Sequence, residues 1–244
     1  METKLLAFHN DPKIKAKYIA RVKAHAKADE IIKGKYWQDG KGCAVGCTVE
    51  VNSNAHDQYP KELGISWRLA LIEDSLFENL PNDQAKRFPL QFLQSISVGA
   101  DTELVYKKFM IWVLGDKKDG LANIVKDEKQ RDLLKRICDL YKKSLKVEIK
   151  QSEWKELADE AYYAYDYASA YAYASASASA YASAYASASA YASASAYASA
   201  YASNYDSDYA SAYASAYASE WNEIKDKRII QMKNKLISLL KSAK

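Results

Sequence analysis

An alternating block of alanine with serine or tyrosine constrains the fold of this chain more than any other feature. From Ala168 to Ala202, every even-numbered residue is alanine and every odd-numbered residue is serine or tyrosine. Alternation is formally a strand pattern, but alanine favours helices over strands. No glycine or proline follows Gly120, so a folded sheet would lack ordinary turn residues. We therefore expect residues 151–219 to form a low-complexity helical region; a silk-like strand stack and disorder are the alternatives.

Such a helix has no single apolar stripe. Steps of two residues rotate by about 200° on a helix, so alanine and serine spread around the whole cylinder. A helix of this kind needs close neighbours on several sides, from its own chain or from another copy. The cluster Asn204-Tyr-Asp-Ser-Asp208 is the candidate point for folding back, since Asn and Asp favour caps and turns. The alternative is that its aspartates only solubilise one continuous helix.

Helical periodicity also dominates the rest of the chain, so we predict an all-α fold. Residues 1–150 are expected to form a helical N-terminal domain with a Gly/Cys loop at 35–59. Residues 151–219 form the long Ala/Ser/Tyr-rich helical C-terminal region, and residues 220–244 a final amphipathic helix. Within the first domain the caps and apolar spacing predict helices over 11–33, 66–80, 83–96 (bent or broken near Pro89), 101–114 and 127–145. Residues 109–114 could alternatively be a short strand.

Composition limits the classes of function. The segment 161–219 carries three acidic residues and no lysine or arginine, so the rest of the chain holds 35 basic and 28 acidic residues, a formal net charge of +7. Lysine-rich helices are usually solvated faces, and we do not expect nucleic-acid binding. The N-terminal residues lack the apolar core of a signal peptide, and no span suits a membrane. Three cysteines in this context predict a cytoplasmic protein.

The loop Asp39-Gly-Lys-Gly-Cys-Ala-Val-Gly-Cys47 is a candidate anion site. Its glycines would let backbone N–H groups converge on an anion, and Lys41 adds positive charge. Tyr36 and Trp37 precede the loop and could stack on a planar ligand such as a base. The spacing matches neither common phosphate-binding glycine motif, so a tight structural loop anchored by these aromatics is the alternative.

Cys43, Cys47 and His56 are spaced as metal ligands are. Cys-x3-Cys with a histidine nine residues beyond supplies three donors. A fourth ligand is not evident, so we predict no metal site. Two small buried thiols that pack the loop, or a nucleophilic cysteine beside a histidine base, are the alternatives.

Three ionisable residues fall on apolar helix faces. His25 and Asp29 lie one turn apart on the first expected helix, and Glu73 lies within the core face of the second. Burying charge is costly unless it is paired, so we expect either a satisfied His25–Asp29 pair or a polar ligand pocket lined by all three. Asp74 and Glu78 are expected on the solvated side of the second helix.

Several strings of the sequence resemble a family of uncharacterised bacterial and phage proteins. They are Phe8-His-Asn-Asp-Pro12, Gly40-Lys-Gly-Cys-Ala-Val-Gly-Cys47, Glu62-Leu-Gly-Ile65, Leu71-Ile-Glu-Asp74 with Phe77-Glu78, and the Ala/Tyr-rich tail. The resemblance covers nearly the whole chain and implies a phage or prophage setting. The tail departs from it in having more serine. No functional residue can be carried over, because the resemblance implies no activity.

Together these features predict an accessory binding protein that sequesters a small anionic, nucleotide-like ligand or engages a host protein. A metal-assisted or His/Asp/Glu hydrolase is the first alternative. A structural protein that self-associates into a homo-oligomer through the Ala/Ser/Tyr region is the second. The sequence identifies no cofactor and does not decide whether the protein is an enzyme. The candidate ligand-binding residues are His25, Asp29, Tyr36, Trp37, Lys41, Cys43, Cys47, His56 and Glu73.

Overall fold

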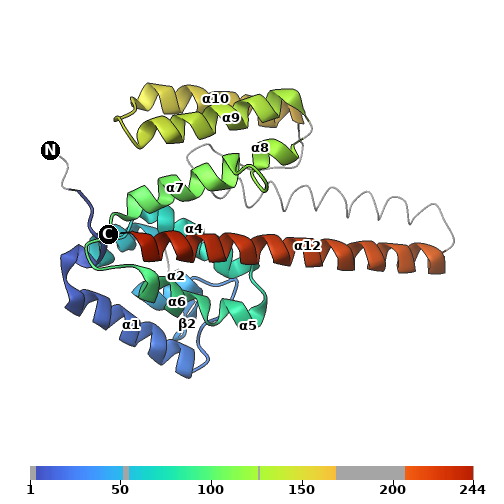
Figure 1. Ribbon diagram of the computed structural model, residues 1–244. Coiled ribbons are helices and arrows are strands. Elements are labelled where there is room, and N and C mark those ends of the chain that lie inside the picture. Colours follow the sequence, from blue (N-terminus) through green and yellow to red (C-terminus); the bar gives the residue numbers. More distant parts are fainter. Residues whose placement is uncertain (1–3, 52–54, 126, 169–206, 244) are drawn as a thin grey trace.

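The computed structural model describes residues 4–51, 55–125, 127–168 and 207–243 (Figure 1). Within these ranges the predicted all-α fold is confirmed, with two short strands as the exceptions. None of the described helices is long and apolar enough to cross a membrane. The strict Ala alternation and most of the Asn204–Asp208 cluster lie outside the described residues. The elements are η1 (Ala7–Asn10), α1 (Pro12–Lys27), β1 (Trp37–Gln38), β2 (Lys41–Gly42), α2 (Ala44–Val49), α3 (Ala55–Gln58), η2 (Tyr59–Leu63), α4 (Trp67–Asn79), α5 (Asn82–Ala85), α6 (Phe88–Ser95), α7 (Thr102–Gly115), α8 (Leu121–Ile124), α9 (Glu128–Ser144), α10 (Gln151–Ala168) and α12 (Ser207–Ser242).

Helix α1 begins where its cap predicts but ends early. The Asp11 carboxylate accepts a hydrogen bond from the Lys13 N–H at 2.8 Å, as an N-cap does. The helix stops at Lys27 instead of the expected Lys33, because Asp29 adopts a left-handed conformation with φ of 55°. Aspartate tolerates this region better than most residues. The chain then turns back toward the core at Ile31, which forms an isolated bridge with Gly42.

The segment expected as one Gly/Cys loop over 35–59 is more ordered than predicted. Strands β1 and β2 form a tight antiparallel hairpin, and α2 follows with all six of its residues buried. The glycines serve close packing. A Cβ atom on Gly46 would stand 1.4 Å from the Tyr36 carbonyl oxygen, and one on Gly42 would stand 2.1 Å from it. The backbone at Tyr36 can lie against α2 only because these two residues have no side chain.

Helix α4 is the central element. It contacts α2, α3, α6, α7 and α12, and its buried residues include Leu69, Ile72, Leu76 and Phe77. Its bounds match the expected 66–80 closely. The break expected near Pro89 separates α5 from α6, and α7 is helical throughout, which excludes the strand alternative for residues 109–114.

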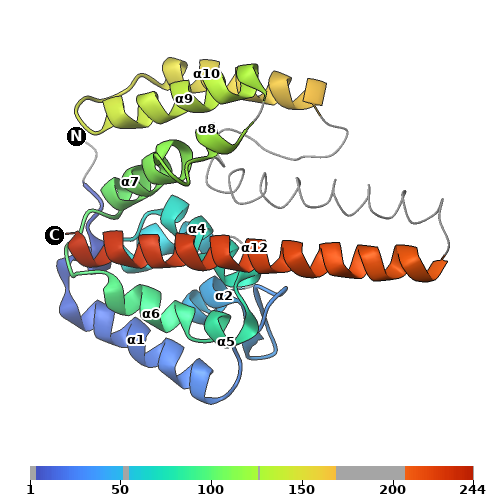
Figure 2. The same cartoon turned by 45° about the vertical axis from the view of Figure 1, so that its right-hand side comes forward.

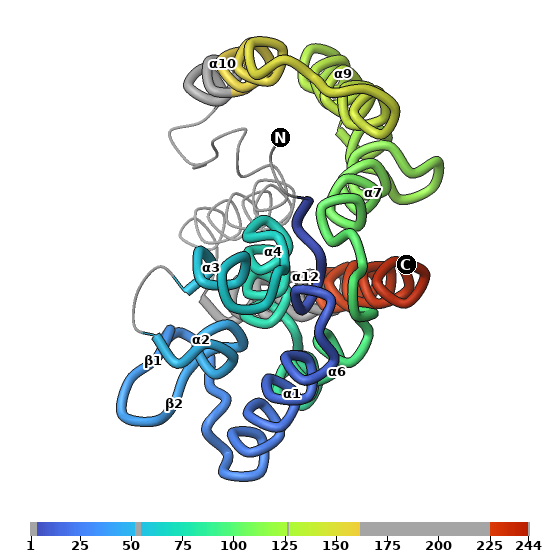
Figure 3. The backbone as a smooth tube through the Cα atoms, turned by 90° about the vertical axis from the view of Figure 1, so that its left-hand side faces the viewer, coloured from blue at the N-terminus to red at the C-terminus, as the bar shows by residue number. Residues whose placement is uncertain are grey.

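Helices α9 and α10 pack together at one edge of the molecule, and α7 links them to the rest (Figure 3). The hydroxyl groups of Tyr106 on α7 and Tyr141 on α9 are hydrogen-bonded at 2.8 Å. The ring of Trp154, on α10, packs on Tyr141 with centroids 4.8 Å apart. These aromatic contacts tie the edge pair to the core.

The end of α12 belongs to the core. The amphipathic helix expected over 220–244 is the last part of a longer helix that begins at Ser207. It runs between α6 and α7 and also contacts α4 (Figure 2). Lys233 donates to the Gln84 side chain, and Gln231 donates to Asp119, both at 2.6 Å. The apolar side chains that it buries are Ile229, Met232, Leu236, Ile237 and Leu240.

Candidate functional site

Four side chains with metal-ligating or titratable groups meet where α2, α3 and α4 converge. Cys43 precedes α2, His56 lies on α3, and Asp74 and Glu78 lie one turn apart on α4. We call these four residues the Cys43 cluster. Residues four apart share a helix face, so both carboxylates point the same way. Cys43 is fixed as the N-cap of α2, because its Sγ accepts from the Gly46 N–H at 3.5 Å.

The cluster is compact. The Cys43 Sγ and one carboxylate oxygen each from Asp74 and Glu78 lie within 4.8 Å of one another. The His56 Nε2 lies 3.1 Å from the Asp74 Oδ2. The Tyr36 ring stands edge-on to the His56 ring, with centroids 5.6 Å apart, and is itself 45% exposed. The cluster is therefore a shallowly buried group with an aromatic residue at its rim.

Its electrostatics favour a positively charged partner. The Asp74 Oδ1 is buried and has no hydrogen-bond partner among the described residues. Both oxygens of Glu78 accept from the single N–H of Gly34 at 3.0 Å, and burial raises the pKa of that carboxyl. Burial, followed by the charge of Asp74, raises the pKa of the Cys43 thiol. Lys33 is close enough to Glu78 to offset part of the rise in its pKa, and His56 lies beside the Asp74 Oδ2, but the Asp74 Oδ1 has no partner of either kind among the described residues.

Glu73 is a fully buried carboxyl group, at 0% exposure. It faces the interior, as its place on the helix predicts, but it does not meet His25. Its Oε2 accepts from the Tyr59 hydroxyl at 2.8 Å, and its Oε1 has no partner in the described structure. Burial raises the pKa of Glu73 well above its ordinary value, which favours the neutral acid.

The expected His25–Asp29 pair does not form. Asp29 lies beyond the end of α1, its side chain is 75% exposed, and it pairs with Lys86 at 2.5 Å. This hydrogen bond to the Lys86 ammonium lowers the pKa of Asp29. The pairing was mispredicted because i, i+4 spacing holds only while the helix continues. The polar pocket of His25, Asp29 and Glu73 is therefore absent from the described structure.

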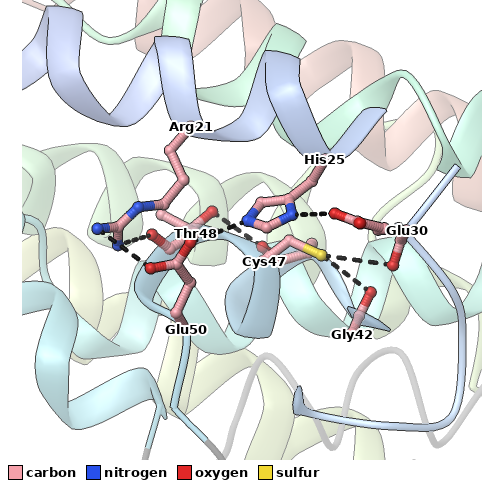
Figure 4. Close-up of polar contacts among 8 residues, drawn as sticks. Arg21, His25, Glu30, Gly42, Cys47, Thr48 and Glu50 are labelled. Carbon is pink, nitrogen blue, oxygen red and sulfur yellow. Dashed lines mark hydrogen bonds and ion pairs between the residues drawn. The ribbon is translucent and has the colours of Figure 1, made fainter. Parts of the chain in front are cut away.

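His25 instead joins two glutamates (Figure 4). Its Nδ1 lies 2.6 Å from Glu30 and its Nε2 lies 3.1 Å from Glu50, so the imidazolium form could donate to both. Arg21 adds a second cation 3.3 Å from Glu50. The edge of the half-buried Trp37 ring packs on the histidine, with centroids 5.0 Å apart. This group fastens the segment after α1 to the end of α2 and leaves none of its charges available.

Cys47 faces away from the Cys43 cluster. Its thiol donates to the Gly42 carbonyl at 3.3 Å and points toward the Glu30 carbonyl at 3.7 Å (Figure 4). Burial raises the pKa of Cys47 to about 12, which keeps the thiol protonated. Cys47 therefore does not join Cys43 and His56, although their spacing in the sequence resembles that of metal ligands.

The Gly-rich loop does not offer its N–H groups to an anion. The Gly42 N–H donates to the Glu30 carbonyl at 3.0 Å, and the Cys43 N–H donates to the Lys35 carbonyl at 2.6 Å. The Gly34 N–H is already bound by the Glu78 carboxylate. Lys41 is exposed on the hairpin. Gly42 and Gly46 are explained by close packing, which was the structural alternative, and Gly40 by its positive φ of 79°.

Comparisons with protein-family models, with curated proteins and with solved structures find no match to this chain. The chemistry of the Cys43 cluster is therefore the basis for a functional proposal. Sequence reasoning placed Asp74 and Glu78 on the solvated side of their helix, whereas Asp74 is only 15% exposed. The i, i+4 spacing of Asp74 and Glu78 puts them on one helix face, but their partner Cys43 comes from the start of α2, a helix that the sequence does not predict.

Proposed function

We propose that this protein is an accessory binding protein whose ligand carries positive charge and binds at the Cys43 cluster. The observation that carries the proposal is the buried Asp74 Oδ1, which lacks a partner among the described residues beside a second carboxylate and a thiol. Leaving a buried acceptor unsatisfied costs about 1–3 kcal/mol, and more for a charged group. A cation at this point would remove that cost.

The same geometry favours a cation over the anionic, nucleotide-like ligand expected from the sequence. Asp74 and Glu78 would repel a phosphate or carboxylate at the cluster. The N–H groups of Gly34, Gly42 and Cys43 are already bonded within the chain. The accessory role in a phage or prophage rests on the resemblance of the sequence strings.

The structure limits which residues a hydrolase could use. A mechanism that uses His25, Asp29 and Glu73 has no support, since these three residues do not meet. A metal-assisted hydrolase would have to use the Cys43 cluster and keep one coordination position open for water. Self-association through the Ala/Ser/Tyr region depends on residues outside those described, so the contacts available here do not favour it.

Thermal denaturation of the full chain with a panel of small ligands tests the sign of the ligand charge. We expect zinc, magnesium or spermidine to raise the Tm, because binding to the folded state stabilises it. The double variant Asp74→Asn/Glu78→Gln should lose this increase. Asp29→Asn, which alters an exposed carboxylate outside the cluster, should retain it.

Phosphate and adenosine monophosphate serve as the anionic probes. We expect neither to raise the Tm of the wild-type chain. A rise with these anions, and none with the cations, would overturn the proposal. A cation effect that is equal in the double variant and in Asp29→Asn would also overturn it, since binding would then lie elsewhere.

A further inference from the structure

The Cys43 cluster combines donor types that rarely meet by chance in a core. A thiol, an imidazole and two carboxylates come from three helical segments, and the thiol is 2% exposed. Building on the proposed function, we infer that the ligand is a divalent transition-metal ion, zinc in the first place, held by Cys43, His56, Asp74 and Glu78.

The separations between the ligand atoms are slightly larger than those around a bound zinc ion. Zinc binds sulfur, nitrogen and oxygen ligands at about 2.0–2.3 Å, which places tetrahedral ligand atoms about 3.3–3.7 Å apart. The Cys43, Asp74 and Glu78 ligand atoms lie within 4.8 Å of one another. His56 Nε2 already lies 3.1 Å from Asp74 Oδ2. The ligand atoms of Cys43, Asp74 and Glu78 therefore need to move by no more than about 1 Å, and His56, which lies beside Asp74, has to approach Cys43 and Glu78 to complete the set.

The donor atoms select the kind of metal. Calcium and magnesium prefer oxygen ligands throughout, whereas thiolate and imidazole favour zinc and its transition-metal neighbours. Cys43 would bind as the thiolate, and its proton would pass to the solvent. With Asp74 and Glu78 the site then supplies three negative charges around a divalent cation, which answers the unpartnered Asp74 Oδ1.

The number of ligands separates a binding site from a catalytic one. Four protein ligands close a tetrahedral zinc site, whereas catalytic sites keep three and leave the fourth position to water. His56 therefore decides the character of this site. With His56 bound, the metal fastens α2, α3 and α4 together and holds no reactive water.

Cobalt titration of the metal-free full chain tests the inference, because cobalt occupies zinc sites and is coloured. We expect one equivalent to give the intense visible bands of tetrahedral cobalt and a thiolate-to-cobalt charge-transfer band. Zinc should then bleach both. Cys43→Ser keeps an N-capping atom for α2 but should abolish the charge-transfer band. Cys47→Ser removes the neighbouring thiol, and should leave the band intact.

The other ligands are tested by affinity. Asp74→Asn and Glu78→Gln should each weaken zinc binding on the order of a hundredfold, since even outer-shell partners account for about 10- to 100-fold. His56→Gln should weaken binding and shift the visible bands toward a more open coordination. Circular dichroism and a Tm for each metal-free variant establish that it is folded.

Three results would overturn the inference: no cobalt bands in the wild-type chain, a charge-transfer band that survives in Cys43→Ser, or one that disappears equally in Cys47→Ser. If spermidine stabilises the chain through Asp74 and Glu78 while no transition metal binds, only the zinc inference fails. If neither kind of cation binds at these carboxylates, the proposed function fails with it.

Discussion

Single residues in this protein show how a side chain, or its absence, sets the local backbone. Gly46 lies inside a helix, where alanine would ordinarily be favoured by about 1 kcal/mol. Here alanine is disfavoured instead, because its Cβ atom would lie 1.4 Å from the Tyr36 carbonyl oxygen. A backbone carbonyl group cannot move aside as the end of a flexible side chain can.

Gly46→Ala should therefore destabilise the fold by about 3 kcal/mol or more, at the upper end of the cost of overpacking. Gly40→Ala is the matched control, since nothing lies within 4 Å of its Cβ and only its positive φ of 79° opposes the change. That strain costs about 1–2 kcal/mol. Denaturant unfolding of both variants measures whether Gly46→Ala is the more destabilising. Equal losses in the free energy of unfolding would contradict the role of close packing at Gly46.

Tyr18 gives a residue-scale prediction for alkaline pH. It is 2% exposed and its hydroxyl donates to the Glu62 carboxylate. Burial, with that hydrogen bond, raises the pKa of Tyr18 above its ordinary value of 10.0. Its stabilising contribution is thus complete below pH 10 and is lost as the pH rises further, when the tyrosine of the unfolded chain ionises first.

Tyr18→Phe should accordingly cost about 1.5–3 kcal/mol near neutral pH, the range for a hydrogen bond to a charged group. The difference in the free energy of unfolding between the wild-type chain and the variant should be smaller at about pH 11 than at about pH 8. Urea unfolding at both pH values measures it, with the other tyrosines cancelling in the difference. A constant or widening gap would show that Tyr18 is not the group responsible.

At the scale of elements, the contacts of His25 join parts of the chain that its own helix does not reach. Glu30 follows α1 and Glu50 ends α2, so the histidine holds the hairpin segment between them in place. The Glu30 side chain is half-buried, whereas that of Glu50 is 39% exposed, so the contact with Glu30 is the less screened by solvent.

His25→Ala should leave Glu30 and Glu50 without the side chain that contacts both, and loosen residues 30–50 first. We expect faster amide hydrogen exchange in that segment, with α9 and α10 unchanged. His9→Ala is the control, because His9 makes a single exposed hydrogen bond to the Lys61 carbonyl. Unchanged exchange in residues 30–50 would contradict the role given to His25.

Local patterns predicted the elements well where periodicity and caps agree, as in α7 and α9. They failed where tertiary contacts decide the outcome. The end of α1 depends on the left-handed Asp29, and α2 forms among glycines because Tyr36 packs on it. The candidate site suffered most: Asp74 and Glu78 become partners of Cys43 only when α2 lies against α4, which no single-helix pattern encodes.

At the scale of the whole molecule, one core includes residues from both ends of the described chain. Phe8 and Leu240 are both fully buried in it. Leu236→Ala, at 0% exposure, should therefore lower the free energy of unfolding by about 2–5 kcal/mol. Leu239→Ala, whose side chain is only partly buried, should cost clearly less.

Unfolding followed by circular dichroism and by tryptophan fluorescence checks both variants. Because the core is shared, we expect one transition seen alike by the two probes in the wild-type chain and in Leu236→Ala. Separate transitions would mean that α12 detaches before the remaining helices unfold.

The place of α12 has a consequence for biosynthesis. Its buried side chains, from Ile229 to Leu240, pack between α6 and α7. The apolar faces of α6 and α7 therefore stay exposed until these residues have been synthesised. A ribosome adds roughly 5–20 residues per second, so several seconds separate the emergence of α7 from that of its partner. We therefore expect the nascent chain to expose this apolar surface to chaperones until these residues have left the exit tunnel.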